Sequence, residues 1–261
     1  MNNHVQDDPR FITALARGLN VLSCFQSYQT YLTHQQICER TALPKATVTR
    51  LLFTLVQLNY VRYHQTQGVY CLGERALALA SQGEQRHIAQ LEQRQFVQFA
   101  ERYQVSVNLA TIQGHEMVYL ACCRSSARIA VNLQVGSCVP IASTAIGRAF
   151  YATSTSQEQA YIQQLLQQQY SPSEAKNMIT SLLQCTDFYH KNSYSVSDGD
   201  YADDILAVAV ALPRDDTATR HYALNASVPR SLWQKDDLIS HVVPALQQFA
   251  LQLGQQLTFY K

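Results

Sequence analysis

The sequence predicts an α+β protein that joins an N-terminal winged helix-turn-helix domain, residues 1–73, through a linker helix, residues 74–86, to a larger α+β domain, residues 87–261. Two observations predict this arrangement. An amphipathic helix that follows a tight turn and a proline, residues 43–61, is succeeded by two short strand-like runs. From residue 105 onward, strand-like and helical segments occur in mixed order, which indicates a sheet with helices on one or both faces.

The composition fits a globular protein rather than a strongly basic protein that coats nucleic acid. The 261 residues are 47% hydrophobic, which is enough for a sizeable core, and the net charge is only +1. The charge is unevenly spread, because the first 83 residues hold seven Lys or Arg and four Asp or Glu. Positive charge therefore collects at the end that carries the helix of residues 43–61, as expected if that end meets phosphates.

Membrane and secretory segments are not expected. No apolar run approaches the ~18 residues of a membrane span, and residues 1–11 lack the basic start and apolar stretch of a signal peptide. We therefore expect a soluble cytoplasmic protein with no membrane partner. The seven cysteines form no C-x-x-C pair and are expected to behave as small buried hydrophobes.

Catalytic chemistry is not expected either. The sequence has no phosphate-binding loop, G-x-S-x-G or H-E-x-x-H motif, and its eight histidines show no metal-ligand spacing. We predict no enzyme, no cofactor and no metal site. The enzymatic alternative is a nucleophile and base formed by Cys122 or Cys138 with His115.

The first two helices follow from spacing and capping. Residues 11–25 carry apolar side chains at helical spacing, namely Leu15, Leu19, Leu22 and Phe25. Thr33 is expected to cap a short second helix, residues 34–40, and Gln36 completes a capping box. Residues 41–43 form the turn.

Pro44 suits the first position of the third helix, where its missing N–H costs nothing. The predicted buried stripe of this helix consists of Val48, Leu51, Leu52, Leu55 and Leu58. Polar residues fall away from the stripe, and the helix is expected to end at Asn59 and Tyr60. The strand-like residues 60–63 and 69–72 flank a polar turn that ends in Gly68, which predicts a hairpin wing.

This arrangement favours DNA binding, in which the third helix enters the major groove with its N-terminal residues against base edges. Cationic side chains would neutralise phosphates, and the Thr33 hydroxyl with the free N–H groups beside it would bind one more. The candidate DNA-binding residues are Thr33, Lys45, Ala46, Thr47, Thr49, Arg50 and Arg62. The alternative is a sensory or scaffolding module, because tri-helical units with wings also bind proteins.

The sequence resembles the IclR-type bacterial transcription regulators. The N-terminal resemblance lies in LARGLNVLSCF, LTHQQICERTALPKATVTRLLFTLVQLNYV and VYCLGERALALA; downstream it lies in RIAVNLQVGSCVPIASTAIGRAFYA and ALNASVP. It implies a double-stranded DNA operator, a GAF-like effector-binding domain and a small-molecule effector. It also implies that the linker helix pairs with a second subunit, in a homodimer or a dimer of dimers. One departure is Ala42, where the family usually has glycine in the turn.

The remaining elements are assigned by pattern. Helices are expected at residues 74–82, 87–103, 143–153, 158–168, 173–185 and 235–257. Strands are expected at residues 105–112, 116–123, 128–135, 194–196, 205–212 and 222–227. The acidic run at residues 194–204 is expected to be a solvated loop, because the calcium-loop pattern ending in glutamate is missing.

An effector site is predicted where Ser143 and Thr144 precede a helix, because free N–H groups and the helix dipole attract a small carboxylate. The alternative is that Ser143 merely caps an ordinary helix. The resemblance implies further effector-binding residues, namely Val139, Ala145, Ile146, Ile205, Ala207, Asn225 and Ser227. Ala207 and Asn225 replace the family's common cysteine and serine, and Ser197 replaces a common acid, so no particular effector is transferred. Arg128 is either a countercharge for the ligand or a solvated strand end.

Overall fold

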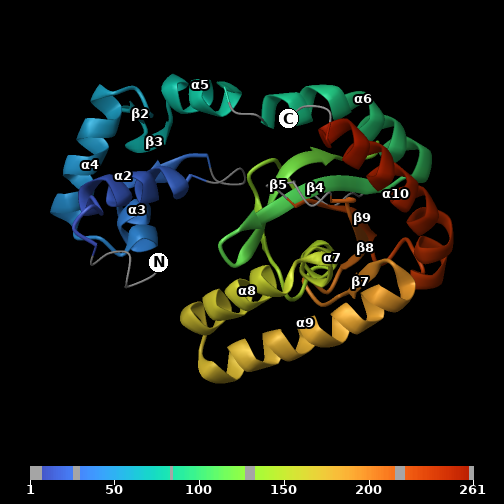
Figure 1. Ribbon diagram of the computed structural model, residues 1–261. Helices are drawn as coiled ribbons and strands as arrows, with labels where there is room; N and C mark the ends of the chain where they lie inside the picture. The colour runs from blue at the N-terminus through green and yellow to red at the C-terminus, as the bar shows by residue number, and fades with distance from the viewer. Residues whose placement is uncertain (1–7, 26–29, 83–84, 127–132, 215–220, 259–261) are drawn as a thin grey trace. The chain divides into compact units, whose positions relative to one another are not determined.

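The computed structural model describes residues 8–25, 30–82, 85–126, 133–214 and 221–258. The chain divides into two compact units, residues 1–86 and residues 87–261 (Figure 1). No helix within the described ranges is both long and apolar enough to cross a membrane.

The N-terminal unit is a three-helix bundle with a small antiparallel sheet. Its elements are α2 (Thr13–Ser23), β1 (Leu32–Thr33), α3 (His34–Thr41), α4 (Lys45–Gln57), β2 (Val61–His64), β3 (Val69–Leu72) and α5 (Glu74–Gln82). The strand order is β1-β3-β2, so the predicted hairpin is present and a third, very short strand joins it. This confirms the predicted winged helix-turn-helix. The core includes Val21, Leu32, Ile37, Val48 and Leu52.

The predicted capping box at the start of α3 is confirmed. The Gln36 N–H donates to Thr33 Oγ1 at 3.3 Å, and the Thr33 N–H donates to Gln36 Oε1 at 2.8 Å. Two boundaries of α4 differ from the prediction. Pro44 precedes the helix instead of opening it, and its carbonyl accepts from the Thr47 and Val48 N–H groups. The helix ends at Gln57, and its C-cap is Leu58.

The predicted apolar face of α2 is wrong in part. Leu15 and Leu19 are 59% and 54% exposed, whereas Val21 is fully buried. The inward face of α2 is the one that packs on α4, where Val21 joins Val48 and Leu52 in the core. Leu58, expected in the buried stripe of α4, is likewise exposed because it lies beyond the helix end.

Within the described residues, the C-terminal unit is built on one antiparallel sheet of six strands. Its strands are β4 (Ser106–Gln113), β5 (Glu116–Cys123), β6 (Cys138–Pro140), β7 (Ser195–Asp198), β8 (Ile205–Ala211) and β9 (Ala223–Pro229). Its helices are α6 (Gln85–Tyr103), α7 (Ala145–Thr153), α8 (Ser156–Gln169), α9 (Pro172–Asn192) and α10 (Lys235–Thr258). The strand order is β6-β5-β4-β9-β8-β7, so strands far apart in sequence become neighbours.

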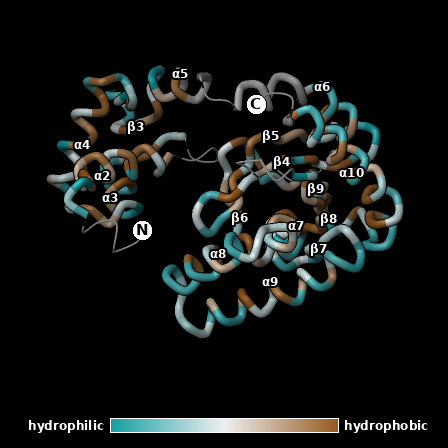
Figure 2. Tube along the Cα trace, in the orientation of Figure 1, coloured by the Kyte–Doolittle hydropathy of each residue, from teal (hydrophilic) through white to brown (hydrophobic). Residues whose placement is uncertain are grey.

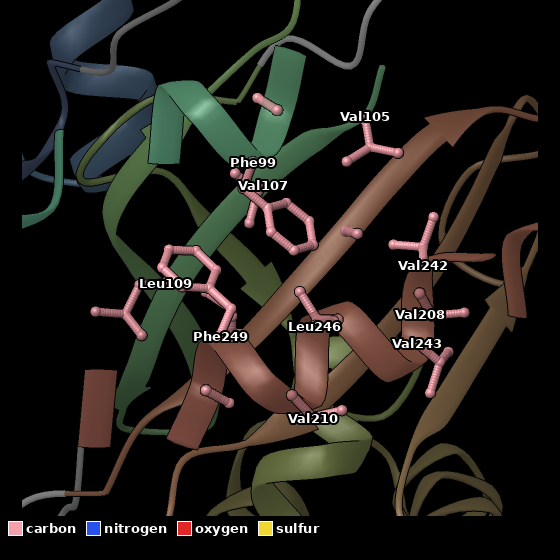
Figure 3. Close-up of a cluster of buried hydrophobic side chains, with 14 of the residues drawn as sticks. Phe99, Val105, Val107, Leu109, Val208, Val210, Val242, Val243, Leu246 and Phe249 are labelled. Carbon is pink, nitrogen blue, oxygen red and sulfur yellow. The ribbon is translucent and has the colours of Figure 1, made fainter. Parts of the chain in front are cut away.

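The sheet separates two cores, because successive side chains of a strand point to opposite faces. One face packs against α6 and α10, where Val107, Leu109 and Val210 meet Phe99 and Phe249 (Figure 3). The other face packs against α7, α8 and α9. The strands are mainly hydrophobic, whereas the outer helices α8 and α9 mix hydrophobic and hydrophilic residues (Figure 2). The unit is therefore a three-layer α/β/α arrangement.

Three assignments in the C-terminal unit change. The predicted strand of residues 128–135 falls largely on residues 127–132, outside the described residues, and Leu133 and Gln134 are not in a strand. The short strand β6, which pairs with β5, was not predicted. Ser143 lies in a turn, and the cap of α7 is Thr144 alone, whose Oγ1 accepts from the Gly147 N–H. The alternative in which Ser143 caps the helix is therefore wrong.

Candidate functional site

The N-terminal half of α4 presents a polar face to solvent. Lys45, Ala46, Thr49 and Arg50 are all exposed and recur at the spacing of one helical turn. Phe53 continues this face one turn further and is 66% exposed. Sequence reasoning did not single out Phe53, although its spacing of four residues from Thr49 places it on the same face.

A hydrogen-bonded chain fixes the middle of this face. Thr49 Oγ1 donates to the Lys45 carbonyl at 2.9 Å, so its lone pairs are left to accept from His34 Nε2, also 2.9 Å away. The second ring nitrogen, His34 Nδ1, then accepts from Cys38 Sγ at 3.5 Å. Thr49 is thus held by the first residue of α3, through a link between residues 15 apart that no local sequence pattern indicates.

The turn between α3 and α4 depends on one unusual residue. Ala42 ends α3 in the left-handed region with φ 53° and ψ 29°. Non-glycine residues seldom adopt this conformation, because the Cβ crowds the following carbonyl. The angle between the two helices, and hence the direction of the exposed face of α4, is set through this residue.

The remaining candidate DNA-binding residues lie beside α4 in this unit. Thr47 is half-buried, and Thr33 is exposed at the N-terminus of α3. Arg62 lies on the wing strand β2 and forms an ion pair with Glu74, the first residue of α5. Both side chains of the pair are exposed, so Arg62 remains accessible to phosphate.

The C-terminal unit contains a pocket between the start of α7 and the sheet. The hollow measures about 310 Å³ with its solvent-open part included, and only a small fraction of this space is enclosed. Six of the predicted effector residues line it, namely Thr144, Ala145, Ile205, Ala207, Asn225 and Ser227. The other lining residues are Tyr119, Leu133, Ser197 and Tyr201. Val139 and Ile146 are instead fully buried in the core beneath, and Ser143 is not among the lining residues. Arg128 lies outside the described residues.

The start of α7 is held tightly against the pocket. Thr144 Oγ1 donates to the Pro140 carbonyl at 2.7 Å and accepts from the Gly147 N–H at 3.2 Å. A Cβ at Gly147 would lie 2.2 Å from the Ile141 carbonyl oxygen, so only glycine allows this approach. The positive end of the helix dipole therefore meets the pocket at Ala145.

Polar groups on the sheet face the same pocket. Asn108 Nδ2 donates to Asn225 Oδ1 at 3.0 Å, and burial holds the pKa of the neighbouring Tyr119 phenol well above its usual value. Ser227 Oγ is buried and has no hydrogen-bond partner within the described residues. Since an unpaired buried hydroxyl is costly, the pocket offers a hydrogen bond to whatever enters it.

The pocket residues suit binding rather than nucleophilic chemistry. None of the lining residues within the described chain carries a charged side chain. Burial raises the pKa of Cys122 to about 12, so this cysteine is a thiol rather than a nucleophilic thiolate at neutral pH. The described residues also contain no His, Cys, Asp and Glu group that could hold a metal ion.

A winged helix-turn-helix followed by a separate α+β unit is the architecture of HTH-type transcription regulators, and two family matches place the chain in this class. Residues 14–65 match the IclR helix-turn-helix domain, and residues 81–255 match the C-terminal domain of IclR bacterial transcriptional regulators. The chain therefore belongs to the IclR family, which comprises transcription regulators rather than enzymes.

Individual relatives agree with this family. The chain is 29% identical over 251 residues to the HTH-type transcriptional regulator TsaQ1/TsaQ2 of Comamonas testosteroni. The aligned region covers 94% of this chain and 88% of the relative. It is 34% identical over 151 residues to the Pca regulon regulatory protein of Pseudomonas putida, covering 56% of this chain and 50% of the relative.

Solved structures share the fold over nearly the whole chain. An IclR family transcriptional regulator from Brucella abortus has a TM-score of 0.76 and 28% identity, covering 96% of this chain and 95% of that one. An IclR homologue from Microbacterium hydrocarbonoxydans, complexed with 4-hydroxybenzoate, has a TM-score of 0.74 and 19% identity. The match covers 94% of this chain and 99% of the homologue.

Proposed function

We propose that this regulator binds a pseudo-palindromic operator through α4 as a homodimer or dimer of dimers, and that a small organic acid in the C-terminal pocket modulates this binding. The exposed face formed by Lys45, Ala46, Thr49 and Arg50 supports the DNA-binding part. Two such faces on one symmetric site would lengthen the recognised sequence and raise affinity.

The unpaired hydroxyl of Ser227 is the observation that carries the effector part. A carboxylate at the start of α7 would accept hydrogen bonds from backbone N–H groups without any cationic side chain. Ser227 and Asn225 would then receive a second polar group of the same ligand, such as a hydroxyl or keto oxygen. The complex of the Microbacterium homologue with 4-hydroxybenzoate, a hydroxylated acid, supports this ligand class.

The DNA-binding part is tested with an operator selected from a random duplex library. Replacing Arg50 by Ala should weaken binding by about 1–3 kcal/mol if the guanidinium contacts a base, and should flatten the salt dependence if it contacts phosphate. Lys176→Ala removes one exposed cation from α9 and is the matched control, with unchanged affinity expected. Failure of the wild-type chain to retain any duplex at low salt would refute the proposal.

The effector part is tested by thermal shift with a panel of aliphatic and aromatic carboxylates. A binding acid should raise the midpoint of the wild-type chain, because a ligand that binds only the folded state stabilises it. The shift should shrink in Ser227→Ala, which removes the unpaired hydroxyl. An equal shift in both proteins would exclude Ser227 from the site.

Exposed Phe53 favours one alternative, in which α4 contacts a protein, since an exposed aromatic side chain is typical of interface anchors. Binding of a protein partner that is insensitive to salt and persists without DNA would support this alternative.

A further inference from the structure

A buried arginine joins three segments around the pocket. Arg148, in the second turn of α7, is only 9% exposed. Its Nε donates to the Ala142 carbonyl at 3.0 Å, and its Nη1 donates to the Val196 carbonyl at 2.7 Å and to Asp200 Oδ2 at 2.8 Å. One guanidinium thus holds the turn before α7, the strand β7 and the loop that follows it.

Each acceptor lies within two residues of a pocket wall. The corresponding lining residues are Thr144, Ser197 and Tyr201. A rigid planar guanidinium with several donors fixes its partners in direction as well as in distance. Arg148 therefore fixes the relative positions of the three segments that carry these lining residues.

The loop of residues 199–204 is held from its other side as well. Arg230 Nε pairs with Asp198 Oδ1 at 2.8 Å, and the Arg230 N–H donates to the Asp204 carbonyl at 2.7 Å. The acidic run was expected to be a solvated loop, and its Asp200, Asp203 and Asp204 are exposed. Two arginines nevertheless contact it. Its Tyr201 is 40% exposed and lines the pocket, so this side chain forms a pocket wall that also meets solvent.

The ion pair between Arg148 and Asp200 is what ties the tyrosine to α7. A buried guanidinium without a counter-charge is unfavourable, so the carboxylate is strongly retained at this position. The same carboxylate accepts from the Asp198 N–H at 3.3 Å, which also fixes the loop backbone. Displacement of the loop backbone at residues 200–201 away from α7 would require the ion pair between Arg148 and Asp200 to break.

We propose that Arg148 and Asp200 are positioning residues that hold Tyr201 over the pocket, and that the Tyr201 ring contacts the effector. The ligand class follows from the walls, because Tyr119 and Tyr201 offer two aromatic side chains to one small cavity. The effector is then an acid with a flat, unsaturated or aromatic body rather than a short aliphatic chain. This inference rests on the proposed effector function.

The first test measures the loop without any ligand. Amide hydrogen exchange of a peptide spanning residues 199–205 is compared in the wild-type chain, Asp200→Asn and Asp203→Asn. Asp203→Asn removes the same charge from an exposed position of the same loop and is the matched control. Exchange should accelerate about tenfold in Asp200→Asn and stay unchanged in Asp203→Asn. Equal exchange in all three proteins would overturn the clamp.

The second test measures binding of 4-hydroxybenzoate by calorimetry. Tyr201→Ala should weaken binding about tenfold and Tyr201→Phe should retain most of it, because the ring makes the contact. Asp200→Asn should weaken binding and Asp203→Asn should not. Unchanged affinity in Tyr201→Ala would overturn the contact. If the wild-type chain binds no acid of the panel, the proposed effector function fails, while the exchange comparison still decides whether the ion pair holds the loop.

Discussion

Ala42 carries backbone strain at the turn of the helix-turn-helix. A left-handed conformation costs a non-glycine residue roughly 1–2 kcal/mol in the folded state. Replacing alanine by glycine removes this strain, but glycine gives the unfolded chain more conformational freedom, so only part of the strain energy appears as a gain in stability. Ala42→Gly should therefore raise the stability of the N-terminal unit by about 0.5–1 kcal/mol.

Thermal unfolding followed by circular dichroism measures this change. Ala46→Gly makes the same chemical substitution at an ordinary helical position of α4 and should lower the midpoint instead. A lower midpoint for Ala42→Gly would mean that the strain inferred from the backbone angle is absent.

His221 makes stability depend on pH. Burial lowers its pKa to about 4, and the positive charge of Arg214 contributes to the same shift. Its ring stacks on Phe150 at 4.3 Å, and Nε2 lies 3.0 Å from Thr153 Oγ1. Because the unfolded chain binds this proton near pH 6.5 and the folded chain only near pH 4, stability is full above 6.5 and falls as the pH drops between these values.

The loss attributable to His221 should reach about 3 kcal/mol near pH 4. Denaturant unfolding at several pH values, for the wild-type chain and His221→Gln, measures it. The variant should be less stable at pH 7 and should lose less stability on acidification. Parallel pH profiles for the two proteins would show that His221 is not the titrating group.

Among the elements, α7 depends on close backbone contact. Gly147 approaches the Ile141 backbone so closely that any Cβ would overlap it. Gly147→Ala should destabilise the C-terminal unit by roughly 3 kcal/mol, because overpacking against backbone cannot be relieved by a rotamer change.

Gly18→Ala in α2 is the matched comparison, since its Cβ would meet only Leu51 at 3.9 Å. That substitution should stabilise its helix by up to about 1 kcal/mol. Thermal midpoints of the two variants decide the point, and a Gly147→Ala protein as stable as the wild type would refute the tight docking of α7.

The elements also show what local sequence can and cannot predict. The capping box of Thr33 and Gln36 was predictable because both partners lie within one helical turn. The inward face of α2 was not, because Leu15 and Val21 are both apolar and only packing against α4 selects between them. The strands β1 and β6 are too short to show a periodicity, so they become visible only through pairing with β3 and β5.

At the scale of the whole molecule, the pocket is a product of topology. Tyr119 comes from β5 and Ile205 from β8, and the order β5-β4-β9-β8 places two other strands between them. No local pattern contains that order, which is why Tyr119 and Tyr201 were not predicted. Thr144 was predictable, since a cap residue directly before a helix is a local signal. Ala145 was implied only by the resemblance to the family.

The two proposed activities, operator binding and acid binding, lie in different units, so regulation would require coupling between them. An acid can change operator affinity only if it binds the DNA-competent state and the incompetent state with different affinity. The coupling is reciprocal, so operator DNA must change the affinity for the acid by the same factor.

The most direct test is an anisotropy titration of a labelled, selected operator with the full chain, with and without a saturating acid that binds the C-terminal pocket. The acid is expected to change the operator dissociation constant by about 5- to 150-fold, and Ser227→Ala should need more acid for the same change. Saturation of the pocket by the acid with no change in operator affinity would contradict it.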